Sequence, residues 1–300
     1  MPPFPHAGEI AALATACCWT VTALAFESAG KRVGSLAVNL IRLVIAALFL
    51  SAFCWAVRGL PLPTDASLHA WGWLALSGIV GFTIGDLCLF RAFVVVGSRI
   101  SMLLMSLVPP MTALIGWALL GERLDGWDWA GMALTVGGVS WVVAERKRDG
   151  NGMIAARPPV SGILLGLGGA LGQAVGLVLS KHGMGDYHPF AATQIRVYAG
   201  IAGFAVLFCC IGWWPKVNAA LRNRGAMARM SLGAVFGPFL GVSLSLAAVK
   251  YTQAGVAATI MSLVPVLILA PSALIKHEPI TARAALGAAI AVGGVSLLFL

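Results

Sequence analysis

Charged residues are scarce in this sequence. Asp, Glu, Lys and Arg make up 10% of its 300 residues, whereas they make up about a quarter of a typical soluble domain. Only 11 residues are acidic, 59% are hydrophobic, and the mean hydropathy is +0.91. This composition excludes an ordinary water-soluble domain and is typical of a protein that crosses a membrane several times.

Catalytic and cofactor motifs are also lacking. The sequence has no G-x-S-x-G, H-E-x-x-H or P-loop pattern, and the run GLGGALG at 166–172 does not match G-x-G-x-x-G. An intramembrane aspartyl protease needs two aspartates within the membrane, and only Asp86 lies inside an apolar run. A channel is typically lined by a ring of like polar residues, which no apolar run supplies. An enzyme and a channel are therefore the weakest alternatives, and we expect neither a cofactor nor a metal site.

The placement of basic residues and cysteines disfavours two further classes. The net charge is +9, but the 20 Lys and Arg residues fall almost entirely between apolar runs. No basic, aromatic-interleaved surface is left for a nucleic acid. The cysteines all lie inside apolar runs, so their even number does not indicate a disulfide framework, and we expect free thiols that face lipid or the helix bundle. They are Cys17, Cys18, Cys54, Cys88, Cys209 and Cys210.

Long apolar runs are present instead, and they predict ten transmembrane helices. Each run is bounded by charged residues, proline or turn residues, and a length of about 20 residues is enough to cross the hydrocarbon. None shows the two-residue alternation of a barrel strand, so the predicted fold class is an all-α polytopic membrane protein. The predicted helices are 10–26, 35–57, 70–90, 100–120, 128–144, 161–181, 190–214, 230–250, 254–276 and 282–300.

An internal repeat relates the two halves of the chain. The sequence MSLVP at 105–109 recurs at 261–265, and VGGVS at 136–140 recurs at 292–296, both with an offset of 156. Across the 36 positions from the start of the first motif to the end of the second, 13 residues are identical. The chain therefore contains two copies of one unit.

The number of helices in each copy determines how the copies are related in the membrane. We divide the chain into a first repeat at 1–149, a polar linker at 150–160 and a second repeat at 161–300. Each repeat holds five predicted helices, and because five is odd, the second repeat must enter the membrane from the opposite face. Inverted repeats are the architecture of many secondary transporters, whose substrate site lies near the midplane between the halves.

The repeat motifs also carry a resemblance to a known family. Each SLVP helix ends at a glutamate, Glu122 in GER and Glu278 in HEP, and a helix with the pattern G-x-x-x-x-x-G-G-V follows. On these motifs the chain resembles the EamA family of the drug/metabolite transporter superfamily over nearly its whole length, with His277 departing from Gly121 of the first repeat. Within the family it is most similar to amino-acid exporters of the YddG type. The resemblance implies a ten-helix secondary transporter of small metabolites.

Paired prolines mark the predicted fourth and ninth helices. Pro109 and Pro110 lie in the middle of the fourth helix, and Pro265 lies in the ninth, its repeat mate. Paired interruptions in corresponding membrane segments point to a transport site or a hinge. Ser106 and Ser262, three residues earlier, can bond the freed carbonyls or a substrate.

A polar and aromatic stripe runs along the predicted first helix. Thr15, Trp19 and Thr22 recur with helical spacing. At an offset of 154, Gln173 in the predicted sixth helix is the repeat equivalent of Trp19. The two faces are expected to line a substrate cavity. The alternative is that Trp19 faces lipid while the threonines bond to carbonyls of their own helix.

Three charged residues lie within predicted helices. Asp86 is costly inside a membrane and is expected to face a cavity or a partner; it can bind a substrate amine, carry a proton, or neutralise an arginine. Arg42 and Arg196 are related by the offset of 154 and lie about 10 Å deep. They either snorkel to the headgroups or form a symmetrical pair that attracts carboxylates. All three are candidates for charge or ion coupling.

Basic loop residues predict the orientation. Of the 18 Lys and Arg residues other than Arg42 and Arg196, 14 lie in loops that follow odd-numbered helices. The positive-inside rule then places both termini outside, on the periplasmic side of a bacterial inner membrane. Lys181 and Lys250 lie on the other side, at helix ends, and are expected to be interfacial anchors.

The combined prediction is a secondary transporter in the lipid bilayer of the inner membrane. It would export small molecules, above all neutral or aromatic amino acids, by alternating access. Because no ATP site is found, the drive would come from a gradient of protons or of substrate. The main alternative is a multidrug or organic-cation exporter, in which Asp86 and Trp19 would supply the charge and the aromatic face.

Overall fold

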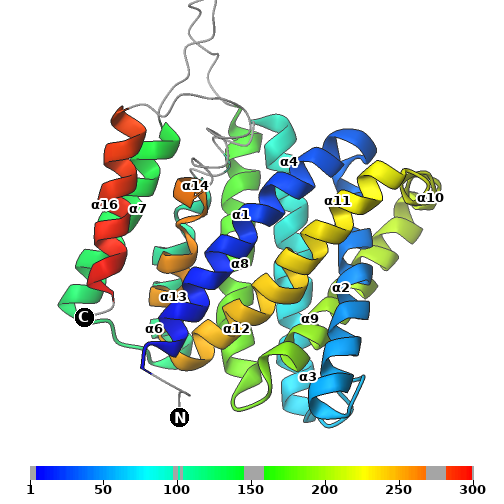
Figure 1. The fold of residues 1–300 in the computed structure, drawn as a ribbon, viewed down its shortest axis with the longest axis horizontal. Coiled ribbons are helices and arrows are strands. Elements are labelled where there is room, and N and C mark those ends of the chain that lie inside the picture. The colour runs from blue at the N-terminus through cyan, green and yellow to red at the C-terminus, as the bar shows by residue number, and fades with distance from the viewer. Residues whose placement is uncertain (1–4, 97–100, 102–103, 145–158, 268–281, 299–300) are drawn as a thin grey trace, which may run out of the picture.

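The fold is an all-helical bundle (Figure 1). A computed structural model describes residues 5–96, 101, 104–144, 159–267 and 282–298. Within these ranges the regular elements are helices, and no strand occurs. The predicted all-α class is therefore confirmed for this part of the chain.

The helices of the two halves follow the same order. Those of the first half are α1 (Ala7–Val33), α2 (Ser35–Arg58), α3 (Leu68–Gly78), η1 (Ile79–Gly85), α4 (Asp86–Val95), α6 (Val108–Leu120) and α7 (Gly126–Ala144). Those of the second half are α8 (Val160–Met184), α9 (Pro189–Ile211), α10 (Trp214–Leu221), α11 (Arg224–Ala234), η2 (Val235–Gly241), α12 (Val242–Tyr251), α13 (Ala254–Met261), α14 (Val264–Leu267) and α16 (Ala282–Leu297).

Two π-helices occupy equivalent positions in the halves. The bounds of η1 and η2 differ by 156 residues, which is the offset of the sequence repeat. Each continues a helix on both sides, so α3–η1–α4 and α11–η2–α12 are single spans with a widened turn in the middle. Pro238 lies inside η2 and cannot donate a backbone hydrogen bond there. π-turns are frequent at functional sites, so these two segments mark a region of interest.

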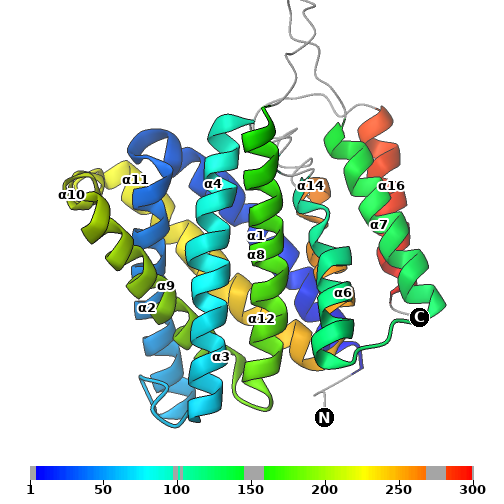
Figure 2. The same cartoon turned by 180° about the vertical axis from the view of Figure 1, so that it is seen from behind.

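Helices of one repeat pack mainly on those of the other. α1 lies against α11, η2, α12 and α13, whereas α8 lies against α3, η1, α4 and α6. α2 contacts α9, and α7 contacts α16 at one edge of the molecule (Figures 1 and 2). α1 begins and α16 ends at the same end of the bundle, here called the terminal end, whereas α8 begins at the opposite end (Figure 1). The second repeat therefore runs inverted relative to the first.

Glycines allow the close approach of these helices. A Cβ on Gly172 of α8 would lie 2.7 Å from Cα of Gly85 in η1, and a Cβ on Gly138 of α7 would lie 2.6 Å from the backbone nitrogen of Ala291 in α16. Both distances are too short for any side chain, so these positions require glycine. Gly172 and the VGGVS motif that contains Gly138 thus lie on packing surfaces between helices.

Within the described ranges, six helical spans are long and apolar enough to cross a membrane. They are Ala7–Gly30, Ser35–Arg58, Leu68–Ala92, Val160–Met184, Pro189–Ile211 and Arg224–Tyr251. Val108–Leu120 and Ala285–Leu297 are apolar but shorter. The total of ten transmembrane helices therefore stays a prediction, and the linker at 150–160 lies almost wholly outside the described residues.

The segment after α9 differs from the prediction. The seventh helix, predicted to reach residue 214, ends at Ile211, and the basic segment between the predicted seventh and eighth helices is largely helical. Pro215 fits the first turn of α10, where its missing N–H is harmless. Asn223 then caps α11, because its side-chain oxygen accepts a hydrogen bond from the Ala226 nitrogen at 3.0 Å. The basic charge of this segment is typical of a loop, but Pro215 and Asn223 favour the starts of two helices.

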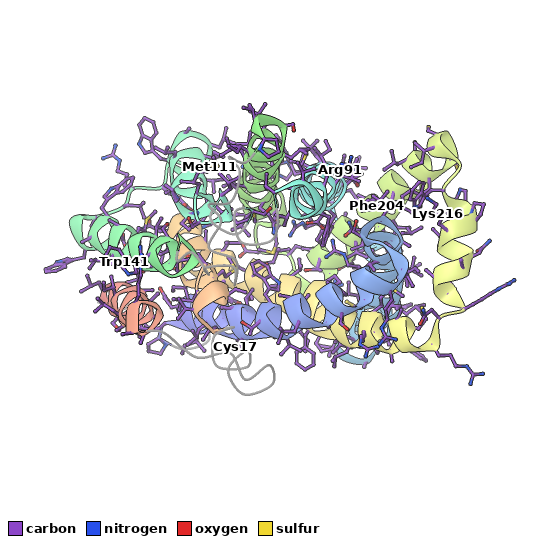
Figure 3. All side chains as sticks on the ribbon, turned by 90° about the horizontal axis from the view of Figure 1, so that it is seen from above. Cys17, Arg91, Met111, Trp141, Phe204 and Lys216 are labelled. Atoms are coloured by element: carbon purple, nitrogen blue, oxygen red, sulfur yellow. The ribbon has the colours of Figure 1, made fainter. Side chains whose placement is uncertain are left out.

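Apolar side chains cover the outside of the bundle, as a lipid-facing surface requires. Leu48, Trp55 and Val206 are each more than half exposed. Trp141 points away from α7 at one edge of the molecule (Figure 3), and the Arg283 guanidinium stacks over its ring at 4.9 Å. All six cysteines are free; Cys17, Cys209 and Cys210 face outward and Cys54 is buried.

Candidate functional site

Both SLVP motifs interrupt a helix. α6 begins at Val108 and α14 at Val264, each after a two-residue turn at 106–107 or 262–263. Pro109 and Pro110 thus lie in the first turn of α6, and Pro265 is the second residue of α14. The expectation of a continuous fourth helix with prolines at its middle is corrected: the prolines begin a new helix, where no N–H is needed.

We expect the double variant Pro109→Ala/Pro265→Ala to be expressed but to exchange substrate several-fold more slowly. Alanine restores N–H donors and a high helix propensity, so the helix can continue through the turn and lose its freedom to bend. The measurement is exchange of labelled substrate by purified protein in liposomes. Pro215→Ala, in the first turn of α10, is the control. Unchanged exchange in the double variant would leave the prolines with a packing role only.

The stripe on α1 packs against η2 of the other repeat. A Cβ on Gly237 would lie 2.9 Å from Cγ2 of Thr22, and a Cβ on Gly241 would lie 2.6 Å from Nε1 of Trp19. The aromatic ring and the threonine methyl therefore lie directly on the backbone of the π-helix. Trp19 is half-buried there.

The threonine hydroxyls of this stripe bond to backbone carbonyls. The Thr15 hydroxyl donates to the Ala11 carbonyl at 2.8 Å and lies 3.4 Å from the Gly241 carbonyl. The Thr22 hydroxyl donates to the Cys18 carbonyl at 2.9 Å. This bonding within the helix is the alternative that the sequence left open, although Thr15 also touches η2.

The matching stripe on α8 packs against η1. Gln173 is half-buried at the position equivalent to Trp19. Gly176 lies about one helical turn further along α8, and a Cβ on it would lie 3.2 Å from Cα of Gly81 in η1. The two stripes therefore each meet the π-helix of the opposite repeat rather than each other. Whether they line a substrate cavity stays a prediction.

The serines before the prolines bond within the protein. The hydroxyls of Ser106 and Ser140, on α7, lie 3.1 Å apart. The Ser262 hydroxyl donates to the Thr259 carbonyl at 2.7 Å. Ser106 thus links the interrupted helix to α7, and Ser262 stabilises its own turn.

A buried ion pair joins α2 to the start of α4. Arg42 bonds to Asp86 through one guanidinium nitrogen, and both side chains are only 9% exposed. Asp86 is the first residue after η1, so the end of the π-helix positions its carboxylate. The Arg42 guanidinium also lies over the rings of Phe26 and Phe90, at 5.4 and 5.5 Å. Asp86 therefore neutralises an arginine, one of the roles that the sequence allowed.

Arg196 lies on α9, which packs on both α2 and η1. It is 3% exposed, and its guanidinium lies 5.0 Å above the ring of Phe82 in η1. A Cβ on Gly81 would lie 3.3 Å from its Nη2 atom. Both arginines are buried inside the bundle in this conformation, which favours the paired interpretation over snorkelling. With Asp86 they form a buried cluster, hereafter the arginine cluster, with two positive charges and one negative.

Buried polar atoms without partners lie on the elements around the arginine cluster. Asn39 precedes Arg42 by one helical turn and is fully buried, and neither of its amide atoms has a hydrogen bond to any described residue. The hydroxyls of Thr83 in η1 and Ser243 in α12 also lack partners in this part of the chain. Buried polar groups are rarely left without a hydrogen bond, so this region is suited to a polar ligand. These three residues cannot be recognised from the sequence, because a lone Asn, Thr or Ser in an apolar run carries no pattern.

A second set of polar contacts lies at the terminal end and links the repeats. Lys181, at the end of α8, forms an ion pair with Glu122 at 2.5 Å. The other oxygen of Glu122 accepts a hydrogen bond at 3.0 Å from the nitrogen of Ala254, the first residue of α13. Lys181 also donates to the Thr252 carbonyl at 2.6 Å, and the Thr252 hydroxyl bonds to Glu9 at 3.0 Å. Lys181 is thus more than the predicted interfacial anchor: it joins a helix end to the other repeat.

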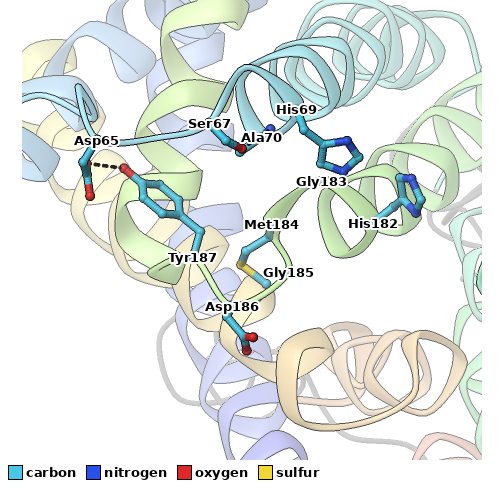
Figure 4. Close-up of a pocket in the computed structure, with 10 residues that line it drawn as sticks. All are labelled: Asp65, Ser67, His69, Ala70, His182, Gly183, Met184, Gly185, Asp186 and Tyr187. Atoms are coloured by element: carbon cyan, nitrogen blue, oxygen red, sulfur yellow. Dashed lines mark hydrogen bonds between the residues drawn. The ribbon is translucent and has the colours of Figure 1, made fainter.

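A surface pocket of 480 Å³ lies between the ends of α3 and α8 (Figure 4). None of the residues that line it belongs to the arginine cluster. Tyr187 donates a hydrogen bond to Asp65 at 2.8 Å, which ties the loop after α8 to the loop after α2. Burial, with that bond to Asp65, raises the pKa of Tyr187 to about 12. The phenol therefore stays protonated at physiological pH and serves as a donor.

Comparison with known families covers nearly the whole chain. The model of the EamA-like transporter family matches twice, at residues 6–144 and 160–300. The chain belongs to the EamA-like transporter family. No curated protein matches it. A crystal structure whose title states no function has a TM-score of 0.75 with 19% identity and covers 98% of this chain and 96% of that chain, which supports the fold.

Membership in the EamA-like transporter family establishes the broad class. The protein is a multi-pass membrane transporter of small molecules. The two matches contain the two interrupted SLVP helices and the two π-helices. Each copy of the family domain therefore carries the same two departures from a regular helix.

Proposed function

We propose that the protein exports small metabolites, specifically amino acids, by alternating access. The observation that carries this proposal is the pairing of interruptions in two inverted repeats. η1 and η2 are equivalent, and so are the turns at 106–107 and 262–263. Such segments bend more easily than regular helices, and their pairing lets one half rock against the other around a central site.

The charge of the arginine cluster favours an amino acid over an organic cation. Asp86 is the acid that a cationic drug would need, but Arg42 already binds it. The cluster has a net charge of +1, which repels a cation and attracts a carboxylate. Trp19 and Gln173, on the two stripes, would contact the side chain and the polar groups of a neutral or aromatic amino acid. This substrate class is also the one implied by the resemblance to YddG-type exporters.

The remaining features of the proposal follow from the sequence. No ATP-binding pattern is present, so the drive would be a gradient of substrate or of protons. From the basic loops we infer that the terminal end faces outside, on the periplasmic side if the membrane is a bacterial inner membrane. Export then runs from the end where α8 begins towards the terminal end.

The proposal predicts amino-acid export that depends on the two stripes. Cells that overproduce the protein should tolerate toxic levels of a set of neutral amino acids, and purified protein in liposomes should exchange those amino acids without ATP. Trp19→Ala and Gln173→Ala should abolish the tolerance, because they remove the aromatic contact and a hydrogen-bonding group. Leu48→Ala, on the lipid-facing surface, is the matched control. Tolerance of cationic dyes but of no amino acid would contradict the proposal and favour the multidrug alternative.

A further inference from the structure

Arg196 is a buried charge that no acidic side chain in the described part of the chain contacts directly. Among the described residues, no hydrogen bond or ion pair involves its guanidinium, and its Nε atom is fully buried without a partner. An unpaired charge in a low-dielectric interior is strongly unfavourable, and proteins pair such groups or remove them. The contact with the Phe82 ring offsets only part of this cost.

The repeat explains why Arg196 has no partner. Arg42 and Arg196 are equivalent residues, and Arg42 has its acid in Asp86. The position equivalent to Asp86 in the second repeat is Val242, a buried apolar residue. The second repeat thus keeps the arginine and lacks the aspartate that would pair with it. Asp86 cannot fully serve both arginines, because its ion pair is formed with Arg42.

The surroundings of Arg196 fit a small carboxylate. Gly81 has no side chain beside Nη2, so the guanidinium rests against the η1 backbone, and a carboxylate would reach it only if the packing between η1 and α8 opened during transport. A guanidinium binds a carboxylate with two parallel hydrogen bonds, and the carboxylate of an amino acid would neutralise the charge of Arg196 locally. The ammonium group of the zwitterion would have to lie away from both arginines. Thr83 supplies a further unpartnered hydroxyl at the interface of η1 and α9.

We propose that Arg196 binds the carboxylate of the transported substrate and that Arg42, held by Asp86, does not. This assignment rests on the proposed function, because it names the group that recognises an amino acid. It makes the site asymmetric although the fold is nearly symmetric. It also predicts that a compound with the side chain of the substrate, but without its carboxylate, binds poorly.

The first test compares L-phenylalanine with L-phenylalaninamide, which lacks the negative charge. Wild-type protein in detergent should bind L-phenylalanine, or whichever amino acid the export screen identifies, about tenfold to a hundredfold more tightly than its amide. Arg196→Gln should lose this preference. Lys216→Gln, which removes an exposed charge on α10, should keep it. An Arg196→Gln variant that still prefers the acid would overturn the assignment while leaving the proposed function intact; binding of cations but of no amino acid would overturn both.

A second measurement distinguishes a ligand-binding residue from a structural one. Arg196→Met removes an uncompensated charge, so the unfolding temperature of the ligand-free protein should rise, whereas stabilisation by added amino acid should disappear. A structural arginine would behave in the opposite way, with a lower unfolding temperature and unchanged stabilisation by the amino acid. Inorganic phosphate serves as the competing probe: stabilisation by phosphate but not by the amino acid would overturn the choice of a carboxylate.

Discussion

Asp86→Ala is expected to lower the free energy of unfolding by about 3–5 kcal/mol, because it leaves two arginines buried without any negative charge. Removal of one partner of a buried ion pair is more damaging than removal of both. The double variant Arg42→Met/Asp86→Leu should therefore regain most of the loss. Unfolding of purified protein in detergent, followed by circular dichroism, gives the comparison.

The Arg58–Asp65 ion pair at the terminal end is the matched control. The Asp65 side chain is 39% exposed, so its pair is screened by solvent, and Asp65→Ala should change stability by less than about 1 kcal/mol. If Asp86→Ala were as mild as Asp65→Ala, the arginine cluster would have to be hydrated rather than buried. The double variant Arg42→Met/Asp86→Leu would then show no recovery of the free energy of unfolding.

Glu122→Gln is expected to open the terminal end. It breaks the ion pair with Lys181 and weakens the hydrogen bond to the nitrogen of Ala254, two contacts that hold Glu122 of the first repeat to the second. Loss of charged hydrogen bonds worth about 1.5–3 kcal/mol would raise the population of the open state about tenfold or more. A cysteine at Ala257, fully buried on α13, in an otherwise cysteine-free protein reports this opening. An impermeant maleimide should label it about tenfold faster in the Glu122→Gln background.

Lys250→Ala is the matched control for this experiment. Lys250 lies at the same end, but its ammonium bonds to the carbonyls of Asp186 and Tyr187, which belong to its own repeat. Its loss should leave the labelling rate unchanged. Labelling in intact cells would also support the orientation with the terminal end outside, whereas labelling only in inside-out vesicles would reverse it. Equal labelling in the Glu122→Gln and unmodified backgrounds would show that these contacts do not close the terminal end.

The sequence determined where the long helices lie and that they come in two copies. A membrane span must be apolar over about 20 residues whatever its neighbours are, so its position can be read from the chain alone. The predicted helix at 35–57 is α2, Ser35–Arg58, and the one at 161–181 is α8, Val160–Met184. The sequence also indicates that the helices are interrupted near Pro109 and Pro265, because proline acts on its own backbone, but it places these prolines in mid-helix rather than at the starts of α6 and α14.

The pairing of side chains was decided by the tertiary structure. Arg42, Asp86 and Arg196 were each recognisable as charges within apolar runs, but the sequence could not say which arginine Asp86 neutralises. That choice depends on how α2, η1 and α9 pack. Glu122 and Lys181 lie 59 positions apart in different repeats, and only the folded chain brings them to 2.5 Å.

The π-helices show most clearly what sequence alone leaves undetermined. Residues 79–85 are apolar and contain glycine, like much of the chain, so their composition does not distinguish a π-turn from an α-turn, whereas Pro238 in 235–241 indicates only an interruption. In the folded chain both segments lie at the repeat interface, where Gly81 and Gly237 meet Gly176 and Thr22. Helix location is a local property of hydrophobic length, whereas π-turns, ion pairs and the vacant partner position of Arg196 depend on packing between segments far apart in the chain.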